Sequence, residues 1–105
     1  MSNESVARAV VVLPPADVTL VESPACHFCA DAEDVIVELS GEFDLHVRRV
    51  PTQSVEGMEL MQEFGAAMSP LVLLDGEYVT AGRLSRGKVR KMLETRLARL
   101  EGSQR

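Results

Sequence analysis

Residues 18–29 read VTLVESPACHFC and contain the only two cysteines of the chain, Cys26 and Cys29. The apolar run at 18–21 predicts a strand buried on both faces, and the run from about Cys29 to Leu39 predicts a helix. Cys26 is therefore expected at a strand-to-helix turn, at or near the helix N-terminus. Unpaired backbone N–H groups and the helix dipole favour an anion there. A reactive cysteine must become an anion, because the thiolate is the nucleophile.

The composition fits one small globular domain. The chain has 105 residues, of which 46% are hydrophobic, and this is enough for a modest core. No apolar run is long enough to cross a bilayer, and the longest, Ala9 to Leu13, is too short for a signal peptide. We therefore expect a cytoplasmic protein that does not associate with membranes. A C-x-x-C pair in a cytosolic chain of alternating strands and helices is typical of redox-active cysteines.

Charge is distributed unevenly along the chain. Residues 1–82 carry three basic and fourteen acidic side chains, net −11, whereas residues 83–105 carry eight basic and two acidic ones, net +6. We expect the basic end to be the solvated face of a helix, and the alternative is a docking surface for an acidic partner. Nucleic-acid binding is not expected, because the domain is acidic overall and lacks aromatic platforms for bases.

The first half of the domain reads as strand, helix, strand, helix. The first helix is expected to end near Ser40, before Gly41, and the second strand spans Leu45 to Val50. A second helix should run from a cap at Thr52 or Ser54 to about Phe64. The buried stripes are predicted at three- and four-residue spacing: Ala32, Val35, Ile36, Leu39 and Phe43 in the first helix, and Val55, Met58, Met61 and Phe64 in the second. Met58, Met61, Met68 and Met92 are predicted to fill the core rather than to bind a soft metal.

The second half predicts a hairpin and a final helix. A strand at 71–74, the turn Asp75-Gly76 and a strand at 78–81 form the hairpin. Ser85 caps the last helix, whose apolar face consists of Val89, Met92, Leu93, Leu97 and Leu100. Residues 1–16 are expected to form a partly disordered arm, with Val6 to Leu13 as an extra strand or a docked segment, and residues 102–105 a frayed tail.

The predicted order is therefore βαβαββα, an α/β domain at residues 17–101. Strands separated by helices imply parallel pairing with right-handed crossovers, and the hairpin adds an antiparallel edge. We thus predict a four-stranded mixed sheet flanked on both faces by three helices.

Order, motif and spacing together resemble the thioredoxin fold, and the small size resembles a glutaredoxin. The resemblance covers roughly residues 17–100. It rests on four features: SPACHFC at 23–29, a helix that ends in Phe64-Gly65, Met68-Ser69-Pro70 before a strand, and LLDGEY at 73–78 with Ala81-Gly82 before the last helix.

The resemblance implies a thiol–disulfide oxidoreductase acting by dithiol exchange on protein or low-molecular-weight disulfides. Cys26 would attack the substrate disulfide, and Cys29 would then attack Cys26 and release the reduced substrate. His27 would tune the reactivity of Cys26 and Phe28 would contact substrate. The resemblance also implies a cis bond before Pro70, next to the sulfurs, and substrate contacts from Ser69, Pro70, Ala81, Gly82 and Arg83.

Several positions depart from the glutaredoxin and thioredoxin patterns. Ser23 stands where glutathione-using glutaredoxins carry a basic residue, and Ala81-Gly82-Arg83 replaces Gly-Gly followed by acids. The tryptophan before the first thioredoxin cysteine is missing, and Leu20 replaces the buried acid of strand one. No cofactor is expected, with glutathione or another small thiol as a candidate co-substrate, and a reductase or thiol as electron source for a monomeric protein.

Four alternatives to this interpretation remain. The cysteines could form an inert structural disulfide, although closing so short a loop removes little unfolded-state entropy. They could bind zinc with His27 and His46, which is not a credible tetrahedral set, so no metal is expected. An iron–sulfur cluster shared between two chains occurs in some glutaredoxins. Finally, the domain could be a non-catalytic redox sensor or adaptor that binds an acidic partner through its basic last helix.

Overall fold

The computed structural model describes residues 13–103, and the order of elements is the predicted βαβαββα. The predicted strands and helices are confirmed, with ends that differ by a few residues. The elements are β1 (Ala16–Glu22), α2 (His27–Leu39), β2 (Leu45–Pro51), α3 (Val55–Glu63), β3 (Leu71–Leu74), β4 (Glu77–Ala81) and α4 (Arg86–Ser103). None of the helices in this described range is long and apolar enough to span a membrane.

The four strands form one mixed sheet in the order β2-β1-β3-β4. β1 pairs in parallel with β2, as expected for two strands joined by a helix. β3, however, runs antiparallel to β1, so the expectation of parallel pairing for every strand that follows a helix is wrong. The reason is the length of α3. Its nine residues span about 13 Å, too short to return the chain along a strand of about 23 Å, so β3 starts at the end of the sheet where β2 stops.

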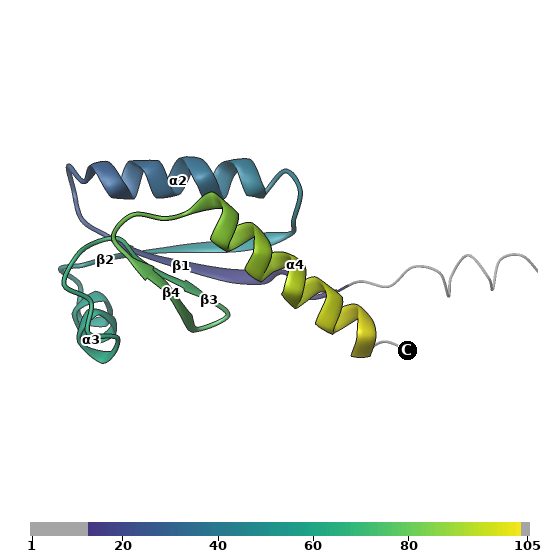
Figure 1. Cartoon of the computed structure of the whole chain (residues 1–105). Helices are drawn as coiled ribbons and strands as arrows, with labels where there is room; N and C mark the ends of the chain where they lie inside the picture. Colours follow the sequence, from purple (N-terminus) through teal and green to yellow (C-terminus); the bar gives the residue numbers. More distant parts are fainter. Residues whose placement is uncertain (1–12, 104–105) are drawn as a thin grey trace, which may run out of the picture.

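The helices cover both faces of the sheet, α2 and α4 on one and α3 on the other (Figure 1). Alternate residues of β1 supply the two cores, since side chains along a strand point to opposite faces. Val18 and Leu20 pack under α2 and α4, whereas Val21 packs toward α3. The prediction that this strand is buried on both faces is confirmed.

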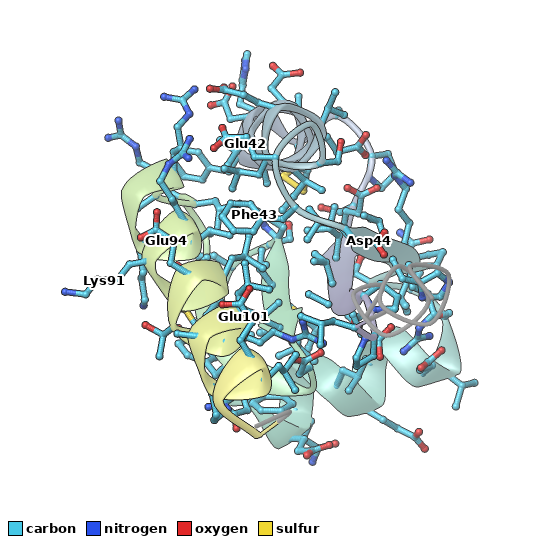
Figure 2. All side chains as sticks on the ribbon, turned by 90° about the vertical axis from the view of Figure 1, so that its right-hand side faces the viewer. Glu42, Phe43, Asp44, Lys91, Glu94 and Glu101 are labelled. Atoms are coloured by element: carbon cyan, nitrogen blue, oxygen red, sulfur yellow. A yellow bond between two sulfur atoms is a disulfide. The ribbon has the colours of Figure 1, made fainter. Side chains whose placement is uncertain are left out.

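The predicted stripe of α2 is confirmed, and it packs against the larger core. Phe43, the residue that extends this stripe past the helix end, lies between α2 and α4 (Figure 2). Val89 and Leu93 of α4 are buried in the same core, with Met92 partly buried beside them. The two helices therefore share one apolar layer above the sheet.

The predicted stripe of α3 is partly wrong. Val55 and Met58 are 69% and 54% exposed, and the buried residue of this helix is Gly57. A Cβ on Gly57 would lie 2.0 Å from the carbonyl oxygen of Pro51, so the helix approaches the end of β2 at this glycine. This close approach rotates the packed face to Leu60, Met61 and Phe64. Met58 and Met68 are both exposed and are not core residues.

The hairpin and the last helix follow the prediction closely. Asp75 and Gly76 both have positive φ, 51° and 82°, as a two-residue turn between right-twisted strands requires. Ser85 caps α4 by accepting a hydrogen bond from the Lys88 amide at 3.2 Å. α4 continues to Ser103, so the predicted tail begins inside the helix. The predicted N-terminal segment up to residue 12 lies outside the described residues.

Candidate active site

Cys26 and Cys29 are joined by a disulfide at the N-terminus of α2. Cys26 is the N-cap residue with extended backbone, φ −113° and ψ 112°, and its Sγ accepts a hydrogen bond from the Cys29 amide at 3.1 Å. Ala25, just before it, has a φ of +51° that turns the chain from β1 into the helix. The predicted place of Cys26 is confirmed, and a thiolate there would be stabilised by the amide and the helix dipole.

The two sulfurs differ in access to solvent. Cys29 is only 5% exposed and counts among the core residues, whereas Cys26 is half-buried. An incoming substrate disulfide can therefore reach Cys26 more readily than Cys29. This asymmetry suits a pair in which one sulfur attacks and the other resolves.

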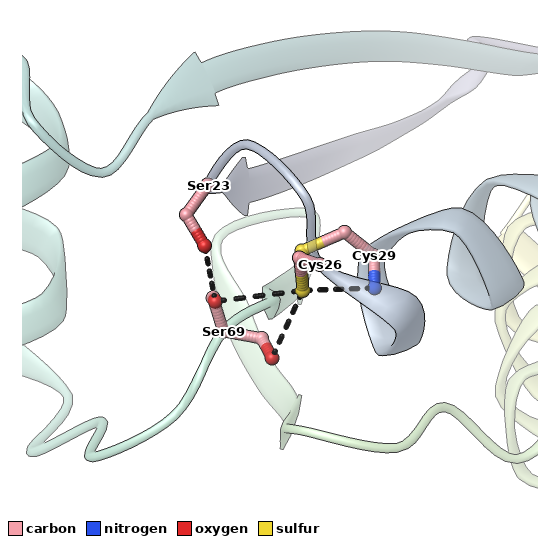
Figure 3. The surroundings of a disulfide bond; sticks show 4 residues. All are labelled: Ser23, Cys26, Cys29 and Ser69. Carbon is pink, nitrogen blue, oxygen red and sulfur yellow. Dashed lines mark hydrogen bonds between the residues drawn. A yellow bond between two sulfur atoms is a disulfide. The ribbon is translucent and has the colours of Figure 1, made fainter.

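The segment before β3 packs directly against Cys26 (Figure 3). Cys26 Sγ lies 3.7 Å from both the carbonyl oxygen and the Oγ of Ser69, and Ser69 Oγ is hydrogen-bonded to Ser23 Oγ at 2.8 Å. The Ser69–Pro70 peptide bond is cis and Pro70 is buried. Ser69 thus contacts two residues that are distant in the chain, Ser23, 46 positions before it, and Cys26, 43 positions before it.

The end of β4 is joined to this segment through the backbone. Gly82 N–H donates to the Pro70 carbonyl at 2.9 Å, and Ala81 pairs with Leu71 in the sheet. Gly82 has a φ of +120°, and a Cβ there would meet the Met68 side chain at 3.7 Å. The structure therefore brings Ala81 and Gly82 beside Ser69 and Pro70. Arg83 is exposed, and its side chain makes no ion pair within residues 13–103.

A shallow depression of about 630 Å³ surrounds the disulfide. His27 is exposed at its rim, and Phe28 is half-buried on the first turn of α2. His46 hydrogen-bonds Asp17 at 3.1 Å, at the opposite end of β1, so it does not join the cysteines. The depression is lined by Glu22, Ser23, Ala25, Cys26, His27, Cys29, Ala30, Glu33 and Asp34.

Comparisons with known proteins agree with this architecture. No family model matches the chain. A probable thioredoxin from Archaeoglobus fulgidus is 26% identical over 74 residues, which are 70% of this chain and 81% of that protein. Among solved structures, a mutant thioredoxin from Halobacterium salinarum superposes with a TM-score of 0.59 at 21% identity, over 77% of this chain and 74% of that one. A reduced thioredoxin pre-protein from Schistosoma mansoni also gives 0.59 at 21% identity, over 90% and 89%.

The protein has the thioredoxin fold. A thioredoxin-like protein from Clostridium perfringens superposes equally well, with a TM-score of 0.60 at 13% identity, over 77% of this chain and 70% of that one. The C-x-x-C pair, the cis-proline segment and the end of β4 meet at one edge of this thioredoxin fold. No particular subtype, glutaredoxin or thioredoxin, is distinguished by these likenesses.

An acidic pair that the sequence patterns did not predict lies beside the disulfide of this thioredoxin fold. Glu22 ends β1, and Glu33 on α2 is held by Arg49 of β2, with Nη2 3.3 Å from its Oε1 and Nε 3.3 Å from its Oε2. Burial, then a hydrogen bond with Glu33 and its negative charge, raise the pKa of Glu22 from 4.5 to about 7. The hydrogen bonds from Arg49 and Glu22 lower the pKa of Glu33. The signal in the sequence was a carboxylate at the end of a buried strand.

Three of the six basic side chains of α4 form ion pairs with acidic side chains of other elements. Arg86 binds Glu38 at 2.8 Å, Arg90 binds Glu42, and Arg96 binds Asp75. Lys91, Glu94 and Glu101 point outward from the helix (Figure 2). Since three of its cations already have acidic partners on other elements, α4 presents less free positive charge than the sequence indicates.

Proposed function

We propose that the protein is a thiol–disulfide oxidoreductase that works by dithiol exchange through Cys26 and Cys29 on protein or low-molecular-weight disulfides. The observation that carries the proposal is the environment of Cys26 Sγ. This sulfur is partly exposed at a helix N-terminus, accepts the Cys29 amide at 3.1 Å, and is bonded to a sulfur that is buried. Such surroundings lower the pKa of a cysteine from ~8.5 to between ~3.5 and ~7.5.

The reaction consists of two exchanges. The Cys26 thiolate attacks one sulfur of a substrate disulfide, a mixed disulfide forms, and the other substrate sulfur leaves as a thiolate. Cys29 then attacks Cys26 Sγ, which releases the second substrate sulfur and closes the Cys26–Cys29 bond. The substrate gains two electrons and the cysteine pair loses them. A reductase or a small thiol then reduces the pair again.

The contacts around Cys26 suggest how substrate is held. The Ser69 carbonyl lies 3.7 Å from Cys26 Sγ, and in our proposal it pairs with the backbone of an extended substrate segment. Exposed Met68, beside Gly82, offers an apolar contact on the same side. Phe28, Ala81 and Pro70 extend this surface, and Arg83 and His27 supply polar groups at its edge.

We also propose a glutaredoxin-like subtype and a cytoplasmic location. Ser23 donates to or accepts from Ser69, so it is engaged within the protein and is not a cation for glutathione. We therefore expect reduction of the protein disulfide by a dithiol or a reductase to be faster than reduction by glutathione. Parallel assays with glutathione, dithiothreitol and thioredoxin reductase as electron sources measure this preference.

Assays of disulfide reduction test the proposed function. Wild-type protein, Cys26→Ser and Cys29→Ser are compared for reduction of a protein disulfide, with circular dichroism to confirm that each variant is folded. We expect Cys26→Ser to lose all activity over the uncatalysed background. Cys29→Ser should form the mixed disulfide but turn over slowly. Equal activity in wild type and Cys26→Ser would end the enzyme interpretation.

A further inference from the structure

A second cavity, of about 380 Å³, lies between α4 and the β3–β4 hairpin. Leu74, at the end of β3, lines it and pairs with Val18 in the sheet. The disulfide site adjoins the other end of β3, where Leu71 follows Ser69 and Pro70. The cavity is therefore separate from the disulfide site, so what it binds is independent of the proposed function.

One side of α4 forms a wall of this cavity. The residues that line it occupy positions 88, 91–92, 95–96 and 99, a three- and four-residue repeat that places them on one helix face. This wall consists of Lys88, Lys91, Met92, Thr95, Arg96 and Arg99. Four of these six side chains are basic, so the wall is strongly cationic.

Within residues 13–103, the α4 cations that lack an acidic partner all line this cavity. Of the six basic side chains of α4, three are paired with acidic side chains of other elements. The other three are Lys88, Lys91 and Arg99. The positive charge that the fold leaves uncompensated on α4 is therefore concentrated at one place.

Apolar side chains line the cavity beside these cations. Leu74 is buried and Met92 is half-buried. Lys88 Nζ donates to the Val79 carbonyl at 2.6 Å, which holds one cation against the hairpin. Lys91 extends outward from α4 (Figure 2), so its ammonium group can meet a ligand that enters from solvent. The cavity thus offers apolar surface and positive charge together.

The lining of the cavity carries an excess of positive charge. Asp75 is paired with Arg96, and these two charges cancel. Glu77 forms no ion pair within the described residues, so it alone opposes the three unpaired cations. Three positive charges and one negative charge leave a net charge of +2. An anion is favoured here, and an apolar body on the same molecule removes the apolar lining from water.

We propose that this cavity binds a small organic anion, an apolar ring system or chain that carries a carboxylate or sulfonate group. The anionic group lies near Lys91 and Arg99, and the apolar body lies against Leu74 and Met92. The volume is within the range of small-molecule sites, ~300–1,000 Å³. A stable protein partner needs ~800 Å² of surface on each side, of which the cavity is only a part. Size and charge together therefore favour a small ligand.

Two fluorescent probes that differ by one charged group test the proposal. Anilinonaphthalene sulfonate is an apolar anion, and phenylnaphthylamine is the same ring system without the sulfonate. Each probe is titrated into oxidised wild-type protein, Lys91→Gln, Arg99→Gln and Arg83→Gln, with circular dichroism to confirm folding. Arg83→Gln is the matched control, because Arg83 is exposed and forms no ion pair within residues 13–103, but lies outside the cavity.

Wild type should bind one equivalent of the sulfonate, and more tightly than the neutral probe. Lys91→Gln and Arg99→Gln should each weaken sulfonate binding about two- to fivefold, as expected for one exposed ion pair. Neither should change binding of the neutral probe, and Arg83→Gln should keep the wild-type affinity for both probes. Equal affinity of wild type for the two probes, or equal losses in all three variants, would overturn the inference.

A change of side-chain size at Thr95, which is exposed on the cavity wall, locates the bound probe. Thr95→Trp inserts a large side chain into the cavity and should weaken binding of both probes about tenfold or more. Thr95→Ala is its control and should keep the wild-type affinity. Undiminished binding in Thr95→Trp would contradict the proposed site.

Nuclear magnetic resonance of the wild-type protein gives the location without any variant. The sulfonate should shift the amide signals of residues 74–77 and 88–99 and leave those of Cys26 and Cys29 in place. Shifts centred on the two cysteines would overturn the inference. Sedimentation of the probe-free protein tests for a second copy in the cavity: a dimer that Thr95→Trp dissociates would assign the cavity to another chain and also overturn it.

Discussion

At the residue scale, reactivity follows from what surrounds each side chain. Cys26 and Cys29 could be found from the C-x-x-C spacing, which is a local signal, whereas Ser69 and Pro70 were expected at the site because of the family resemblance. Glu22 could not be found from the sequence, because its perturbation depends on Glu33 and Arg49, which only the folded sheet and helix bring to it. Local signals identify the sulfurs, and packing decides which acids lie beside them.

The raised pKa of Glu22 predicts a pH effect on stability. Between its ordinary 4.5 and about 7 the folded protein holds a proton on Glu22 that the unfolded chain releases. This contribution is therefore fully present below about pH 4.5 and is lost as pH rises through 7. Urea unfolding at several pH values should show Glu22→Gln gaining stability relative to wild type as pH increases over this window. A constant difference between the two proteins would contradict the assignment.

A second prediction at the scale of single residues concerns the close contact of Gly57 with β2. A Cβ there would lie 2.0 Å from the Pro51 carbonyl oxygen, so α3 must shift away from β2. Gly57→Ala should lower the free energy of unfolding by about 1 to 3 kcal/mol. Gly87→Ala is the matched control, since its Cβ meets only Ser85 Oγ at 4.0 Å, and should be neutral or stabilising. Similar losses in both variants would show that the close approach is not the cause.

At the scale of elements, the bounds of strands and helices could be predicted well and the packed face of α3 could not. Hydrophobic periodicity placed Val55 and Met58 inward, but they are exposed. α3 approaches β2 at Gly57 and therefore packs a different face against the core. The spacing of apolar residues does not predict such a contact, because glycine has no side chain to count. The hairpin turn was predictable, because Asp75-Gly76 satisfies the backbone requirement locally.

Arg96 of α4 contacts both the hairpin and the segment before β1, and we predict a measurable loss of stability when it is replaced. Its guanidinium binds Asp75 of the hairpin and donates to the Pro14 and Pro15 carbonyls at 3.1 and 3.0 Å, and its side chain is 13% exposed. Arg96→Gln should lower the free energy of unfolding by about 1 to 3 kcal/mol, because Asp75 and the two carbonyls lose a charged donor whose side chain is largely buried. Arg86→Gln, which breaks an exposed pair with Glu38, should cost at most ~1 kcal/mol. Urea unfolding of both variants compares them, and equal losses would contradict this reasoning.

At the scale of the whole molecule, the chain order specified the fold class but not the direction of every strand. The rule that strands separated by helices run parallel held for β1 and β2 and failed for β3. The failure places the start of β3, and with it Ser69 and Pro70, at the same end of the sheet as Cys26. The site is thus assembled by the feature that the sequence rule did not predict.

The most direct test of dithiol exchange through Cys26 is to trap its intermediate. Reduced Cys29→Ser and reduced Cys26→Ser are each mixed with dithiodipyridine, and the adducts are located by mass spectrometry of peptides. We predict rapid formation of a stable mixed disulfide on Cys26 in the first protein, and little reaction of buried Cys29 in the second. Equally fast modification of Cys29 in the absence of Cys26 would contradict the assignment of Cys26 as the attacking sulfur.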